Sequence, residues 1–166
     1  SALIVAAVAS IAMLISGDSH ARVVAEHQPA KLAAMEGLYK TTEEGAPLRI
    51  FSIPDSEAKT VRMNVEIPGM LSFLVHRNFS TPVPGLDQFE PDIPPVAIPF
   101  FSFHLMVGLG TFFIALTLYA LWCYRRGTLF RKRWLLWVFV FSVIGPFVAN
   151  QVGWIAAEVG RQPWIV

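Results

Sequence analysis

Hydrophobic residues along this chain gather into three long segments, and a long polar segment separates the first from the second. The apolar segments cover residues 1–16, 96–123 and 134–157. A helix needs about 20 apolar residues to cross a bilayer. The second and third segments therefore predict full membrane spans, and the first predicts the end of a transmembrane helix. The expected fold class is all-α, a polytopic transmembrane helical bundle fragment with one partial and two full spans.

The polar segment, residues 17–95, predicts a large extramembrane loop with most of the chain's proline and acidic residues. Within it, residues 28–39 favour a short helix, because a proline suits the first turn and good helix formers follow. Residues 48–53 and 61–67 alternate apolar and polar side chains, which is typical of short strands or extended segments. Residues 78–95 are rich in proline and glycine and predict an irregular connection.

The connection between the second and third spans, residues 124–133, contains five basic residues. By the positive-inside rule this basic loop is cytoplasmic. The large loop then lies on the outer side, and so does the C-terminal end of the third-span segment, which covers residues 134–166. Pro146 predicts a kink in that span. Because the chain starts inside an apolar run without a basic n-region, we expect a helix that continues upstream rather than a signal peptide.

Composition supports a membrane protein. Of the 166 residues, 54% are hydrophobic, the mean hydropathy is +0.52 and the net charge is +1. Membrane lipid is therefore an expected partner, and the lack of a long basic stripe argues against nucleic acid. A single cysteine, Cys123, excludes an internal disulfide and any multi-cysteine zinc or iron–sulfur site.

The end of the third span contains a carboxylate and a guanidinium, which are costly to hold in a membrane helix. Trp154, Glu158 and Arg161 are spaced i, i+4 and i+7, so a continuous helix would present them on one face. One interpretation is an interfacial anchor with a solvated ion pair. The other is a cofactor site, in which Glu158 is an axial carboxylate to iron. Arg161 would then pair with heme propionates or with Glu158, and Trp154 would stack on a macrocycle.

His104 and Met106 lie in the second span, near its outer end. Positions i and i+2 of a helix point about 200° apart, so both residues cannot bind one iron. Membrane methionines are usually packing residues, and either packing or heme ligation by one of the two fits the sequence.

Lys31 and Glu36 lie on the short helix of the loop. One interpretation is a pair of solvated surface charges. The other is a grip on an amphipathic substrate at the membrane edge, in which Glu36 takes a proton from a hydroxyl and Lys31 hydrogen-bonds the oxygen left behind. Spacing alone leaves both open.

Together these segments resemble the C-terminal half of subunit I of cytochrome bd-type quinol oxidases. Three motifs support the resemblance, in the family's order: Lys31-Leu-Ala-Ala-Met-Glu36, Phe103-His-Leu-Met-Val-Gly108 and Gly153-Trp-Ile-Ala-Ala-Glu-Val-Gly-Arg-Gln-Pro-Trp164. The resemblance implies that Lys31 and Glu36 bind quinol in the periplasmic Q-loop. It also implies that Met106 ligates the low-spin heme b and that Glu158 ligates the high-spin heme b.

For the parent protein, the resemblance implies a terminal respiratory oxidase of the bacterial cytoplasmic (inner) membrane. Such an enzyme oxidises ubiquinol or menaquinol at the outer face, reduces O2 to water and contributes to the proton-motive force. The implied cofactors are two hemes b and a heme d, or a third heme b. The implied partners are subunit II and a small accessory subunit.

The chain departs from the family pattern in two ways. The family often has arginine two residues before the ligand methionine, where this chain has His104. The N-terminal helices with the family's histidine ligands are missing, so we expect the isolated fragment to be inactive. The alternative is a heme-free multi-span membrane transporter or scaffold fragment, in which Glu158 and Arg161 form an interfacial lock.

Overall fold

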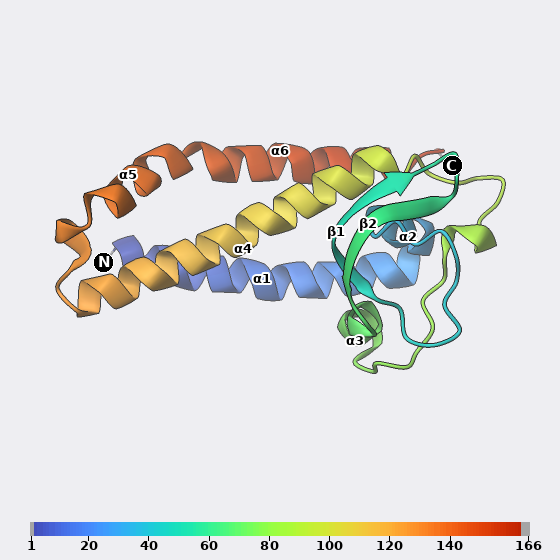
Figure 1. Cartoon of the computed structure of the whole chain (residues 1–166), viewed down its shortest axis with the longest axis horizontal. Coiled ribbons are helices and arrows are strands. Elements are labelled where there is room, and N and C mark those ends of the chain that lie inside the picture. Colours follow the sequence, from blue (N-terminus) through green and yellow to red (C-terminus); the bar gives the residue numbers. More distant parts are fainter. Residues whose placement is uncertain (1, 164–166) are drawn as a thin grey trace.

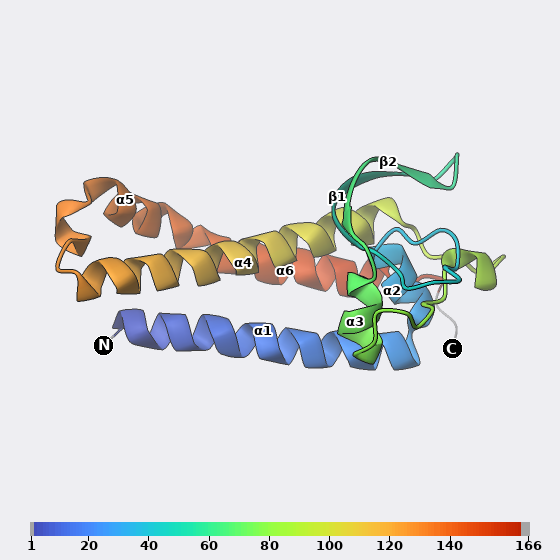
Figure 2. The same cartoon turned by 60° about the horizontal axis from the view of Figure 1, so that its bottom comes forward.

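Three long helical segments lie side by side, and the extramembrane loop folds at one end of them (Figure 1, Figure 2). A computed structural model of the chain describes residues 2–163. Three segments are long and apolar enough to cross a membrane: α1 (Ala2–His27), α4 (Ala97–Arg125) and Arg133–Val159, which comprises α5 (Arg133–Ser142) and α6 (Ile144–Val159). α4 packs against both α1 and α6. The predicted helical bundle is therefore confirmed.

The first helix is longer than its apolar segment. The sequence predicted a partial span ending near Ser16, but α1 continues to His27. The polar extension is stabilised by an i, i+4 ion pair, in which Arg22 lies 2.9 Å from Asp18. Arg77 of the extramembrane loop contacts the same carboxylate at 2.5 Å. α1 thus reaches beyond the apolar region and becomes part of the support for the loop.

The third span is broken near its proline. α5 ends at Ser142 and α6 begins at Ile144, so Pro146 lies in the first turn of α6. A proline has no N–H to donate to the carbonyl one turn earlier, and its ring crowds that carbonyl. The helix therefore breaks one turn before the proline, which confirms the predicted kink.

The extramembrane loop, residues 28–96, contains both helical and strand structure. Its elements in chain order are α2 (Pro29–Met35), β1 (Leu48–Asp55), β2 (Thr60–Ile67), α3 (Met70–His76) and the 3-10 turn η1 (Leu86–Gln88). β1 and β2 pair antiparallel, with Leu48 opposite Ile67 and Asp55 opposite Thr60. The all-α class was therefore incomplete, because the two alternating segments form a hairpin. A second 3-10 turn, η2 (Leu129–Arg131), lies in the basic connection at the opposite end of the bundle (Figure 1).

The buried apolar side chains form one core in the loop and another at the far end of the bundle. The loop core surrounds α2 and consists of Leu32, Ala33, Ala34, Leu38, Ala46, Leu71, Val83, Leu86 and Val96. The second core joins α4, η2 and α5 through Leu116, Ala120, Cys123, Leu129 and Leu135. Because the loop has its own core, α2 and its charged residues have a fixed position at the end of the helices.

One buried hydroxyl ties distant parts of the loop together. Ser72 on α3 accepts a hydrogen bond from the Ala46 backbone N–H and donates one to the Thr81 carbonyl, each at 2.6 Å. The side chain is fully buried. Removing it leaves the buried N–H of Ala46 and the partly buried carbonyl of Thr81 without this partner, and an unsatisfied buried group costs about 1–3 kcal/mol.

Ser72→Ala is therefore expected to open the loop more often. In the full-length complex, limited proteolysis within the loop should accelerate by about tenfold, because cleavage of transiently opened states follows their population. Ser19→Ala is the matched control, since that hydroxyl is exposed and bonds only the carbonyl of its own helix at Ile15. Equal cleavage rates in the wild type and Ser72→Ala would contradict this role.

Candidate functional site

Lys31 and Glu36, the two charged residues of the predicted loop helix, are both buried. Lys31 lies in α2 and is 9% exposed, and Glu36 caps the end of α2 and is 2% exposed. Charged side chains are rarely buried to this extent unless they are paired or functional. Their interpretation as solvated surface charges is therefore wrong.

Glu36 is in contact with the first strand of the hairpin, β1. The guanidinium of Arg49 on β1 donates hydrogen bonds to the carbonyl oxygens of Glu36 and Gly37, each at 2.8 Å. Gly37 has a φ of +62°, a left-handed conformation that glycine adopts readily, and this turn follows α2 directly. Among the described residues, the Oε2 atom of Glu36 has no hydrogen-bond partner. An acceptor without a partner is thus buried in the loop.

Burial raises the pKa of Glu36 to about 7, while the charge of Arg49 and a hydrogen bond from its backbone act in the opposite direction. A carboxyl with a pKa near 7 is present in both protonation states at neutral pH. Such a group is suited to proton transfer, because an efficient general base has a pKa close to the working pH.

Lys31 connects the loop to the end of the third span. Burial lowers the pKa of Lys31, as does the nearby charge of Arg161, while Glu158 has the opposite effect. The stem of Lys31 packs against the backbone at Gly160, where a Cβ atom would lie 3.0 Å from the Lys31 Cγ. The structure therefore brings together two motifs that are far apart in the sequence.

The predicted common face at the end of the third span is confirmed for two of its three residues. The Trp154 indole N–H donates to Glu158 Oε1 at 3.2 Å, one turn along α6. Because α6 ends at Val159, Arg161 lies in the turn that follows and not on the helical face. Trp164, the last residue of the motif, lies outside the described residues.

His104 and Met106 on α4 point to different neighbours, as helix geometry requires. The ring nitrogens of His104 lie 2.9 Å from the carbonyl of Phe100 and 2.8 Å from the carbonyl of Arg49 on β1. Met106 instead faces α6, where a Cβ added at Gly153 would lie 2.7 Å from its sulfur. Of the two residues, Met106 is the one with a side chain directed toward the third span.

Arg49 is the residue of this site that sequence reasoning missed. It lies in a segment whose alternation of apolar and polar residues predicted a short strand or extended segment, and that pattern assigns no role to Arg49. Its side chain is in fact only 12% exposed.

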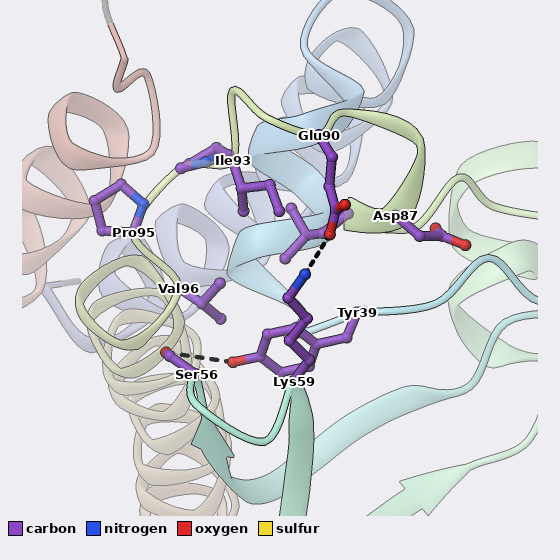
Figure 3. A pocket seen from close by; sticks show the side chains of 10 residues that line it. Tyr39, Ser56, Lys59, Asp87, Glu90, Ile93, Pro95 and Val96 are labelled. Carbon is purple, nitrogen blue, oxygen red and sulfur yellow. Dashed lines mark hydrogen bonds and ion pairs between the residues drawn. The ribbon is translucent and has the colours of Figure 1, made fainter.

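A small hollow in the loop lies apart from these residues. It has a volume of about 140 Å³ and lies beside the N-terminal end of α4 (Figure 3). The Tyr39 hydroxyl lies 3.5 Å from the Ser56 hydroxyl at its wall, and Lys59 pairs with Glu90 across it. None of the predicted site residues lines the hollow.

The fold and the site define a multi-span membrane protein with buried ionisable groups gathered at one end of its helices. The sequence model of the family described as cytochrome bd terminal oxidase subunit I matches residues 1–166. The chain therefore belongs to the cytochrome bd terminal oxidase subunit I family, and the resemblance noted from its motifs is confirmed.

Individual relatives agree with this assignment. Over 175 residues the chain is 35% identical to the cytochrome bd ubiquinol oxidase subunit 1 of Bacillus subtilis (strain 168), which covers 99% of this chain and 37% of that protein. It is 28% identical to the cytochrome bd-II ubiquinol oxidase subunit 1 of Escherichia coli (strain K12), over 95% of this chain and 44% of that protein. The chain thus spans less than half the length of these relatives.

A solved structure also matches. The bd oxidase from Geobacillus thermodenitrificans superposes with a TM-score of 0.77 at 37% identity, over 96% of this chain and 37% of that chain. Membership of this family implies heme as the cofactor class.

The residues present fit a heme. Met106 offers a thioether beside the small residue Gly153, and Glu158 offers a carboxylate oriented by Trp154. A Cβ added at Gly110, one turn after Met106 on α4, would meet no described atom within 4 Å, so this face of the helix has room for a neighbour.

Proposed function

We propose that this chain is the quinol-oxidising and heme-ligating part of subunit I of a terminal respiratory oxidase. The intact enzyme oxidises ubiquinol or menaquinol at the outer membrane face and reduces O2 to water. The observation that supports this most strongly is the buried carboxyl of Glu36, with a pKa of about 7 and an oxygen that lacks a partner among the described residues. No finding favours the alternative, a heme-free transporter or scaffold.

Glu36 is the proton acceptor in this proposal. Its carboxylate accepts the proton of a quinol hydroxyl, and the ammonium of Lys31 donates a hydrogen bond to the oxygen left behind. Lys31 lies in α2 and Glu36 caps its end, and the loop core holds this helix in place at the end of the bundle. The quinol headgroup is therefore oxidised at the membrane edge, close to the ends of α4 and α6.

Met106 would ligate a low-spin heme b, and Glu158 would ligate a high-spin heme b. The hemes supply the electron transfer and the oxygen chemistry. Trp154 orients the Glu158 carboxylate through its indole N–H, and Lys31 places positive charge near that carboxylate. His104 fixes α4 against β1 through the Arg49 carbonyl, next to the Met106 ligand.

Other parts of the complex complete the enzyme. A third heme, heme d or a further heme b, and the remaining axial ligands belong to the part of subunit I that this chain does not span. Subunit II and a small accessory subunit are the protein partners. The basic loop, residues 124–133, faces the cytoplasm of a bacterial inner membrane, and the Q-loop faces the periplasm. Protons released outside and protons for water taken from inside then build a proton-motive force.

Met106→Leu in the full-length subunit is expected to abolish the low-spin heme b signal, because leucine keeps the volume of methionine and lacks its sulfur. A reduced-minus-oxidised absorption spectrum measures this directly. Met13→Leu, an exposed position on α1, is the matched control and should leave the spectrum unchanged. A normal low-spin signal in Met106→Leu would remove Met106 as the ligand.

Glu36→Ala is expected to lower the rate of quinol oxidation by about 100-fold, the usual contribution of a general base. Lys31→Ala should lower the rate in the same direction. The heme content of both variants should match the wild type, as judged by the reduced spectrum. Lys40→Ala, an exposed lysine of the same loop, is the control. Normal turnover in both Lys31→Ala and Glu36→Ala would exclude this loop from the mechanism.

A further inference from the structure

We propose that Arg49 is a positioning residue of the quinol site, which fixes the turn at Glu36 and stabilises the carboxylate that accepts the quinol proton. This inference rests on the proposed function, because it takes Glu36 as the proton acceptor. Neither the sequence motifs nor the role proposed for α2 includes this strand residue.

The geometry at Arg49 is that of a clamp on the end of α2. One nitrogen of its guanidinium, Nη1, donates to two successive carbonyl oxygens, those of Glu36 and Gly37. Hydrogen bonds to a charged donor are stronger than those between neutral groups. Since the Arg49 side chain is mostly buried, water competes little for its hydrogen-bond donors. Arg49 therefore fixes the backbone from which the Glu36 side chain extends.

The backbone of Arg49 is itself fixed by a contact with α4. Its carbonyl oxygen lies 2.8 Å from a ring nitrogen of His104 on α4. A strand that clamps the end of α2 is thus bonded to the helix that contains Met106, two residues further along. This chain of contacts ties the proton acceptor to the proposed heme ligand through Arg49.

The charges around Glu36 come from several elements. Arg49 on β1 is the cation that acts on Glu36, and Glu66 on β2 lies 4.0 Å from the Arg49 Nε. Tyr39 also interacts with Arg49. Lys31 lies on the same helix that Glu36 caps, and it interacts with the C-terminal motif. Arg49 is therefore the positive group of the hairpin that lowers the pKa of the Glu36 carboxyl.

The sign of the Arg49 effect follows from these charges. Burial favours the neutral acid of Glu36, and Arg49 opposes it, leaving the pKa at about 7. Without the guanidinium charge, only the hydrogen bond from the Arg49 backbone still opposes the effect of burial, so the pKa of Glu36 rises further. The carboxylate then forms only at higher pH, and the rate of quinol oxidation should rise with pH over a more alkaline range.

The test uses the full-length complex and follows heme reduction by quinol in a stopped-flow instrument between about pH 5.5 and 9, a range around the pKa of Glu36. The wild-type rate should rise with a midpoint of about 7. In Arg49→Gln, which removes the charge, the midpoint should move up by about one unit. Arg49→Lys, which keeps the charge, should restore the wild-type midpoint. Arg62→Gln is the control, an arginine of the same hairpin that is 72% exposed and pairs with Asp55.

The outcomes separate this inference from the proposed function. A lower rate in Arg49→Gln with an unchanged midpoint would reduce Arg49 to a purely structural role and overturn the inference. Should Arg49→Gln fail to assemble with heme, Arg49→Lys tests the charge. Its midpoint should stay at about 7 because the positive charge is kept, and a midpoint moved to higher pH there overturns the inference as well. Glu36→Gln should lose the pH dependence, and a wild-type profile in that variant would overturn the proposed function itself.

Discussion

The cost of burying ionisable groups in the extramembrane loop is the constraint on which the rest of the site depends. Glu36 is almost completely buried, and its ionised form is favoured by the nearby guanidinium of Arg49 and by a hydrogen bond from the Arg49 backbone. Charged groups in low-dielectric surroundings change their pKa unless a partner compensates for the lost water. Because this compensation is partial, Glu36 titrates near neutral pH, where it can accept and release a proton. A loop without its own apolar core could not exclude water well enough to have this effect.

The same constraint explains why the loop and the spans form one unit. α2 supplies the buried charges, and it is packed against α1 and α4. Lys31 extends from α2 to the backbone at Gly160, directly after the third span. On the other side, His104 of α4 contacts the strand that covers Glu36. The proposed proton acceptor for quinol and the proposed ligands for heme iron are therefore positioned by direct contacts, and small shifts of the loop would change both.

The sequence predicted the parts of this arrangement that depend on local patterns. Runs of apolar residues predicted the spans, and alternation in residues 48–53 and 61–67 predicted short strands or extended segments, which the structure pairs as a hairpin. The structure differs where distant residues interact. α1 extends past its apolar segment because Asp18 pairs with Arg22 and Arg77. The burial of Glu36 and the role of Arg49 could not be predicted, since both arise when β1 folds over the end of α2. Local spacing contains no information on that contact.

The protonation state of Glu36 is the most direct test of this account. Infrared difference spectroscopy of the full-length complex can follow the carbonyl stretch of a protonated carboxyl as the pH is raised, with Glu36→Gln identifying the band. A carboxyl whose pKa is raised remains protonated below that value and ionises above it. The band should disappear with a midpoint of about 7. A midpoint near 4.5, the ordinary value for glutamate, would show that the carboxyl is hydrated and would contradict the account.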